Sequence, residues 1–206
     1  MRSDRLPMFP LGTVLFPHAV LPLHVFEPRY RAMTEHCLAN DARFGVVLIE
    51  RGSEVGGGDR RFGIGTAARI VQAGRLDDGR WVLMTVGEHR VRISEWLTED
   101  PYPQAIVEVL DEQGGPGAGA LLPDLGRALQ RMLALRTELG DPSPGVDVTL
   151  ADDPVRASFE ACALASLNPL DAQQLLELDD TPARLTRLAT LVEEETAVLE
   201  LRLAGG

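Results

Sequence analysis

Arginine side chains offer the first pattern in this chain that could bind a ligand. Arg90 and Arg92 alternate along an expected strand and so share one of its faces. Arg69 and Arg80 belong to neighbouring expected strands and could lie beside them. Guanidinium groups bind carboxylates and phosphates, so Arg69, Arg90 and Arg92 form a candidate face for an anionic ligand. The alternative is a solvated strand face without a ligand.

A second candidate is the stretch of residues 26–31, where a strand is expected to give way to a helix. Aromatic residues with polar neighbours are typical anchors of a protein interface. The candidate peptide-binding set is Phe26, Glu27, Arg29, Tyr30 and Arg31. An exposed strand edge could instead accept an extended peptide through its backbone. The alternative is that both aromatic residues are core and that the arginines pair with nearby acids.

Other sequence patterns that resemble ligand-binding motifs are better explained by a structural role. Residues 63–68, GIGTAA, match a dinucleotide fingerprint, but a strand is expected after them where the fingerprint needs a helix. The glycines at 56–58 lack the lysine of a phosphate-binding loop. The candidate metal ligands are His18, His24, His36 and Cys37. Their spacing along the expected strand and helix argues against a shared metal ion. No cofactor and no metal site are therefore expected.

The composition also argues against catalysis. The chain has 20 basic residues and all are arginine, which removes a P-loop lysine, a Schiff-base lysine and a serine–lysine dyad. Ser53 misses a nucleophile-elbow pattern by one position. Paired aspartates suit turns and helix caps, and they occur at residues 77–78, 152–153 and 179–180. We therefore expect a protein that is not an enzyme.

Charge and cysteine content narrow the partners and the compartment. The formal net charge of −11 argues against a general binder of nucleic-acid backbones, without excluding a local basic patch. Two cysteines imply no disulfide framework, and no apolar signal-peptide core is visible, so a cytoplasmic location is expected. Residues 6–26 carry no charge, but four prolines prevent a membrane-spanning helix there. No membrane partner is expected.

Strands are expected to position these residues in the first part of the chain, residues 1–112. The first expected elements are strands at residues 8–16, 20–26 and 44–50 and a helix at 28–39. Further strands are expected from residue 62 to 110, with a tight hairpin at Asp77-Asp78-Gly79. Six or so strands with mostly local hairpins indicate a small closed or half-closed barrel.

The remaining residues are expected to be helical. Residues 113–120 are rich in glycine and mark a linker, and residues 121–206 are expected to form a bundle of three or four helices. Asp153 and Pro154 suit the cap and first position of one helix. A short helix is expected to begin near Asp171, and the last helix at Thr181.

Several stretches resemble the N-terminal substrate-binding domain of Lon proteases, and they occur in the matching order and spacing. They are PMFPLGTVLFPHAVLPLHVFEPRYRAM, FGVVLI, GTAARI, DDGR, GEHRVRI and PYPQAIVEVLDE, and LNPLDAQQLLELDDTPARLTRL resembles the helical continuation. The resemblance covers nearly the whole chain. It implies an α+β fold, with a PUA-like β-barrel-type domain followed by a C-terminal helical bundle, which in Lon recognises polypeptides.

The resemblance carries over no catalytic residue, because Lon activity needs a P-loop and a serine–lysine dyad that these residues lack. The chain therefore resembles a stand-alone Lon domain without the ATPase and peptidase parts. The main hypothesis is a non-catalytic module that binds unfolded or partner protein segments. The alternatives are an RNA-binding PUA-like module and a regulatory or adaptor protein with one dedicated partner. The sequence leaves the partner and the oligomeric state open.

Overall fold

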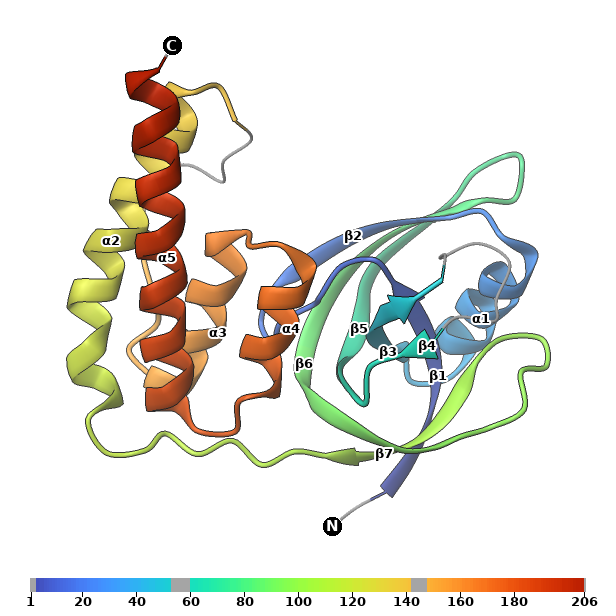
Figure 1. The fold of residues 1–206 in the computed structure, drawn as a ribbon. Helices are drawn as coiled ribbons and strands as arrows, with labels where there is room; N and C mark the ends of the chain where they lie inside the picture. The colour runs from blue at the N-terminus through green and yellow to red at the C-terminus, as the bar shows by residue number, and fades with distance from the viewer. Residues whose placement is uncertain (1–2, 53–59, 142–147, 206) are drawn as a thin grey trace. The chain divides into compact units, whose positions relative to one another are not determined.

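The structure is a computed structural model that describes residues 3–52, 60–141 and 148–205. It divides the chain into two units, Met1–Asp111 and Glu112–Gly206 (Figure 1). Strands and one helix form the first unit, and helices form the second. The glycines at 56–58 and Ser53, discussed above, lie outside the described residues.

The described residues of the first unit form seven strands and one helix. These are β1 (Ser3–Leu11), β2 (Val20–Val25), α1 (Pro28–Ala39), β3 (Arg43–Arg51), β4 (Arg60–Arg61), β5 (Ile64–Arg75), β6 (Trp81–Trp96) and β7 (Gln104–Val109). Helix α1 matches the expected range of 28–39. Strand β1 begins earlier than residue 8, because Ser3 and the residues after it pair with β7. Strand β6 joins two segments that the sequence suggested as separate strands.

The sheet of the first unit closes on itself. Neighbouring strands follow the order β1-β7-β6-β5-β3, and β3 pairs in parallel with β1 to complete the circuit. The other pairings around this circuit are antiparallel. Strand β2 lies outside the circuit and pairs antiparallel with the first part of β6. Closure by β1 and β3 was not predicted, because it joins segments that are not neighbours in sequence.

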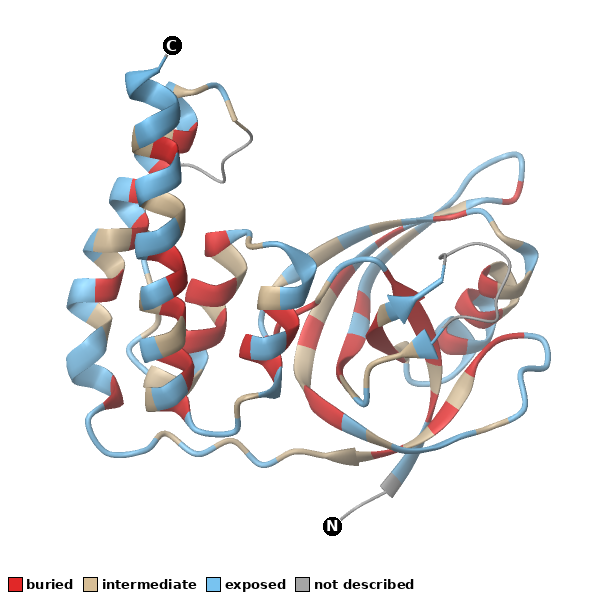
Figure 2. Cartoon of the chain, in the orientation of Figure 1, coloured by how far each residue is buried: buried red, intermediate tan, exposed pale blue. Residues whose placement is uncertain are grey.

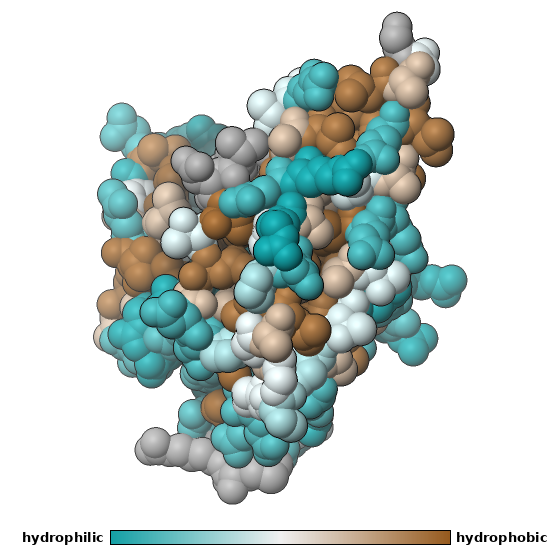
Figure 3. All heavy atoms as spheres, turned by 90° about the vertical axis from the view of Figure 1, so that its left-hand side faces the viewer, coloured by the Kyte–Doolittle hydropathy of each residue, from teal (hydrophilic) through white to brown (hydrophobic). Residues whose placement is uncertain are grey.

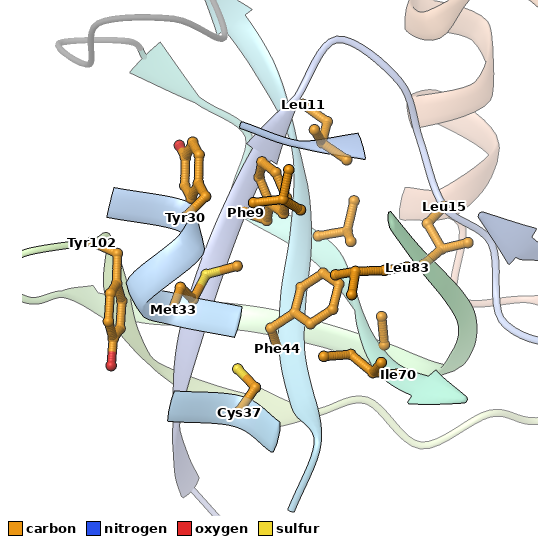
Figure 4. Packing of buried hydrophobic residues seen from close by; sticks show 13 residues of the cluster. Phe9, Leu11, Leu15, Tyr30, Met33, Cys37, Phe44, Ile70, Leu83 and Tyr102 are labelled. Carbon is orange, nitrogen blue, oxygen red and sulfur yellow. The ribbon is translucent and has the colours of Figure 1, made fainter. Parts of the chain in front are cut away.

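Helix α1 packs against the hydrophobic core of this unit. Met33 and Cys37 point from α1 toward Phe44 of β3, and Tyr30 lies beside Phe9 of β1 (Figure 4). The Phe9 and Tyr30 rings stack with their centres 4.2 Å apart. Aromatic stacking stabilises a core beyond simple burial of area.

The second unit contains four helices within its described residues. They are α2 (Ala118–Glu138), α3 (Pro154–Ala165), α4 (Pro169–Glu177) and α5 (Thr181–Ala204). Buried residues line the sides on which α2, α3 and α5 face one another (Figure 2). Hydrophobic side chains also gather near the C-terminal end of α5, where Val198 and Leu201 are exposed (Figure 3).

Local sequence signals explain where these helices begin. The Asp153 side chain accepts a hydrogen bond from the Arg156 N–H at 2.9 Å, which confirms the predicted cap of α3. Helix α4 begins at Pro169, earlier than the start expected near Asp171, because Asn168 caps it. Helix α2 begins at Ala118, inside the expected linker of residues 113–120.

Arg184 of α5 is fully buried and connects several elements of the second unit. Its guanidinium donates hydrogen bonds to Ser158 Oγ at 2.9 Å and to the carbonyl oxygen of Leu178 at 2.5 Å. The guanidinium carbon also lies 3.9 Å from the centre of the Phe159 ring. A buried charge is tolerated only when it is paired and hydrogen-bonded, so this arginine has a structural role.

Each unit contains one buried cysteine, Cys37 in α1 and Cys162 in α3. The pKa of both thiols is raised to about 12, mainly by burial. The charge of Asp41 contributes to this increase at Cys37, whereas the charge of Arg184 partly opposes it at Cys162. Both cysteines therefore behave as core residues and not as nucleophiles. None of the described helices is both long enough and apolar enough to span a membrane.

Candidate functional site

Residues 26–31 form the junction between β2 and α1. Strand β2 ends at the buried Val25, and Pro28 is the first residue of α1. Between them, Glu27 is extended, and its carbonyl oxygen accepts a hydrogen bond from the Arg31 N–H at 2.9 Å. Proline suits the first helical position because the N–H there has no helical partner. The chain therefore passes from strand to helix within two residues.

The two aromatic residues of the junction have different environments. Phe26 is 54% exposed, and its ring meets the His24 ring edge-on with centroids 6.5 Å apart. Tyr30 is only 2% exposed and stacks on Phe9. Of the two expected anchors, Phe26 is accessible to a ligand, whereas Tyr30 belongs to the core and supports the surface from below.

The charged residues of the junction contact one another, the Tyr30 ring and the β5–β6 turn. Arg29 Nε lies 3.1 Å from Glu27 Oε2, and the Arg29 guanidinium carbon lies 4.4 Å from the centre of the Tyr30 ring. Arg31 reaches the β5–β6 turn, because a Cβ on Gly79 would lie 2.3 Å from Arg31 Nη2. Glu27 therefore pairs with Arg29, whose guanidinium lies over the Tyr30 ring.

A pocket of about 280 Å³ lies beside β2 and the junction. Its walls come from Phe9 and Leu11 of β1, from Thr13, and from the β2 residues between Leu21 and Val25. Phe26, Glu27 and Tyr30 complete the lining. Three of the five predicted peptide-binding residues therefore meet at one pocket, and its walls are mostly apolar.

Strand β2 and the first part of β6 expose apolar side chains on their outward face. The register pairs Val20, Pro22 and His24 with Val86, Met84 and Val82. Residues paired in this way point to the same face of a sheet. Val20 is 60% exposed, Val82 is 48% exposed and Met84 is 38% exposed. We call Val20, Pro22, Val82 and Met84 the β2–β6 face. This face is unusual, because the solvent faces of antiparallel sheets are more commonly polar.

Comparison with known families places this arrangement in context. The family model described as the substrate-binding domain of ATP-dependent protease La (LON) matches residues 5–194. The chain belongs to the Lon substrate-binding domain family. The matched range includes the junction, the pocket and the β2–β6 face.

Lon proteases are among the relatives of this family member. Lon protease 2 of Herpetosiphon aurantiacus is 32% identical over 204 residues, which covers 95% of this chain and 24% of that protein. The Lon protease of Koribacter versatilis is 31% identical and is covered to 25% of its length. The chain thus spans about a quarter of the length of these relatives.

Solved structures of Lon N-terminal domains share the fold. The Lon N-terminal domain protein from Xanthomonas campestris is 27% identical, with a TM-score of 0.67 and coverage of 91% of this chain and 98% of that one. The N-terminal domain of Mycobacterium avium complex Lon protease, at 22% identity, has a TM-score of 0.64 and coverage of 94% and 98%. The predicted α+β fold class is confirmed.

The three arginines of the anionic-ligand candidate do not form one exposed face. Arg92 is exposed, but Arg90 is fully buried, so the expected exposure of Arg90 is wrong. Strand alternation predicts which side chains share a face, but it does not predict whether that face is covered. Arg69 Nε donates a hydrogen bond to Glu88 at 2.6 Å and is already paired. The burial of Arg90 and the pairing of Arg69 with Glu88 weaken the RNA-binding alternative.

Sequence reasoning missed the β2–β6 face of this Lon-family domain. The available signal was the segment 81–86, in which five of six residues are apolar and the usual polar alternation is missing. Such a run also fits a strand that is buried on both faces. Only the structure shows that β2 and β6 leave one of these faces open to solvent.

Metal-binding and cofactor patterns gain no support from the geometry. Within residues 3–52, 60–141 and 148–205, no three His, Cys, Asp or Glu side chains are grouped as a metal site would require. The fingerprint-like residues 63–68 run into strand β5, and no helix follows them.

Proposed function

We propose that this chain is a non-catalytic module that binds polypeptide segments through the β2–β6 face, Phe26 and the adjoining pocket. The observation that carries the proposal is the group of exposed apolar side chains on two paired strands beside a mostly apolar pocket. Unfolded chains expose the apolar side chains that folded proteins bury, so such a surface can distinguish the two. The family supports the proposal, since its model describes the substrate-binding part of a protease.

The strength of binding is expected to be moderate. Apolar area removed from water contributes about 25 cal/mol per Å². Ordering a flexible chain offsets much of this gain. We therefore expect dissociation constants in roughly the micromolar range. The net charge of −11 adds a weak long-range preference for segments without excess negative charge.

The first prediction concerns the triple variant Val20→Thr/Val82→Thr/Met84→Thr. Threonine keeps strand propensity but reduces the apolar area of the β2–β6 face. The variant should bind a fluorescent, permanently unfolded protein at least about fivefold more weakly than wild type, as expected when interface anchors are truncated. Fluorescence anisotropy titration measures this difference, after circular dichroism has shown that both proteins are folded.

A matched control removes an exposed leucine from the other unit. Leu170 lies in α4 and is exposed, so Leu170→Gln should leave the affinity unchanged. Equal weakening by the control and by the triple variant would show that binding is not located at the β2–β6 face. Absence of saturable binding to the wild-type protein would contradict the proposed function and favour a dedicated partner.

A further inference from the structure

Strand β2 has one paired edge and one open edge. The Gly87 N–H donates to the carbonyl oxygen of Ala19 at 2.9 Å, and the register continues from this pair along β2 and β6. Backbone groups of an antiparallel strand alternate between its two edges. Leu21, Leu23 and Val25 therefore direct their N–H and C=O groups toward β6. The hydrogen bond from Thr85 Oγ1 to the Leu21 carbonyl oxygen, at 2.7 Å, agrees with this orientation of the Leu21 carbonyl toward β6.

The intervening residues direct their backbone groups away from β6. Val20 and His24 each present an N–H and a C=O group at the open edge, and Pro22 presents a C=O group only. No other strand pairs with this edge among the described residues. An edge with unpaired donors and acceptors is a template for another extended chain.

The apolar pocket lies beside the same strand. It is lined by five consecutive β2 residues, Leu21 to Val25, and by Phe9 and Leu11 of β1. The side chains of Leu21 and Leu23 point to the face opposite the β2–β6 face. A chain extended along β2 would place every second side chain on this pocket side. Backbone groups for pairing and an apolar space for side chains therefore occur together.

We propose that β2 binds an extended polypeptide as an added antiparallel strand, with the alternate apolar side chains of that polypeptide in the pocket beside Leu21 and Leu23. This inference rests on the proposed function and specifies its recognition mode. The ligand is recognised mainly through its backbone, and the pocket selects apolar residues at every second position. Aromatic or aliphatic segments of many sequences satisfy these requirements.

Pro22 gives this edge a particular pattern. Proline lacks an N–H group, so one donor is missing between those of Val20 and His24. Proline on an edge strand limits indiscriminate pairing between sheets. A bound strand would lose one hydrogen bond at this position while keeping the bonds on either side. Binding is therefore reversible and weaker than a complete strand ladder.

The geometry predicts which amides of the ligand are needed. In a strand added antiparallel to β2, the residues that face the pocket direct their N–H groups away from β2, and the residues between them direct theirs toward β2. The probe is a capped, fluorescein-labelled nine-residue peptide that alternates leucine and threonine. Its leucines would occupy the pocket side, and its threonine amides would pair with β2.

Two N-methylated forms of this peptide test the mode with unchanged side chains. Methylation of two threonine amides should weaken binding at least about fivefold, because two hydrogen bonds are lost. Methylation of two leucine amides should change the affinity less than about twofold. Equal effects of the two patterns would overturn strand addition while leaving polypeptide binding in place. If neither this peptide nor an unfolded protein binds, the proposed function itself fails.

Pro22→Ala provides the complementary change in the protein. The variant restores the missing donor, so strand addition predicts peptide binding about three- to tenfold tighter. Binding through side chains alone predicts unchanged or weaker affinity, because apolar area is lost. Sedimentation velocity without peptide tests for self-pairing. A wild-type dimer that excludes the peptide would overturn the proposal, since a second copy would then occupy the edge.

Discussion

Among single residues, Glu88 has an unusual backbone position and a clear electrostatic role. The β5–β6 register pairs Ala67 with His89 and Ala68 with Gly87, so Glu88 is the extra residue of a bulge. Its carboxylate lies 2.6 Å from Arg43 Nε and 2.6 Å from Arg69 Nε. One bulged residue thus joins charges from β3, β5 and β6.

These contacts predict a pH-dependent contribution to stability. Partial burial alone would raise the pKa of Glu88, but hydrogen bonds and charges from Arg43 and Arg69 outweigh it and lower the pKa below 4.5. The folded protein then holds this proton less tightly than the unfolded chain. The stabilising contribution is complete above pH 4.5 and is lost as the pH falls through the lowered value.

The corresponding variant is Glu88→Gln. It should reduce the free energy of unfolding by about 1 kcal/mol at pH 7, and the difference from wild type should shrink as the pH falls below 4.5. Urea unfolding between pH 7 and pH 3 measures both effects. A difference that stays constant over this range would show that the Glu88 carboxylate is not the titrating group.

At the scale of elements, the fingerprint-like residues 63–68 have a packing explanation. A Cβ on Gly65 would lie only 2.3 Å from the carbonyl oxygen of Val46 on β3. Glycine at this position therefore lets β5 approach β3 closely. Gly63 differs, because a Cβ there would meet no atom within 4 Å. One glycine of the pair is required by packing, and the other is not.

This contrast predicts unequal effects of two alanine substitutions. Gly65→Ala should destabilise the protein by about 2 kcal/mol, because the new methyl group meets backbone that cannot move aside without distorting β3. Gly63→Ala should change stability by less than about 0.5 kcal/mol. Thermal or urea unfolding of the two variants provides the comparison. Equal stabilities would show that β3 and β5 separate without cost.

At the scale of the whole molecule, helices were more predictable than the sheet. Helix α1 and the start of α3 follow from Pro28, Asp153 and Pro154, whose effects act within one turn. The order of the strands depends on pairs such as β1 with β7, which are remote in sequence. No local pattern specifies such partners, so a closed or half-closed barrel could be expected, but the strands that close it could not be predicted from periodicity.

The candidate site, like the fold, was only partly predictable from the sequence. Residue types and order predicted both Phe26 and Tyr30 as anchors. Only Phe26 is exposed, because Tyr30 stacks on Phe9 in the core. The open edge of β2 follows from its position outside the circuit of paired strands. That position depends on the whole sheet, so the residues of β2 alone could not reveal it.

The distribution of the two cysteines has a practical consequence. Because Cys37 and Cys162 are buried in different units, each thiol can report when its own unit opens. Both should resist alkylation at pH 8 until the surrounding unit unfolds, since burial both shields the thiol and raises its pKa. Mass spectrometry of the peptides after labelling for different times then gives the opening rate of each unit, without any substitution in the chain. Equal rates under all conditions would mean that the two units open as one.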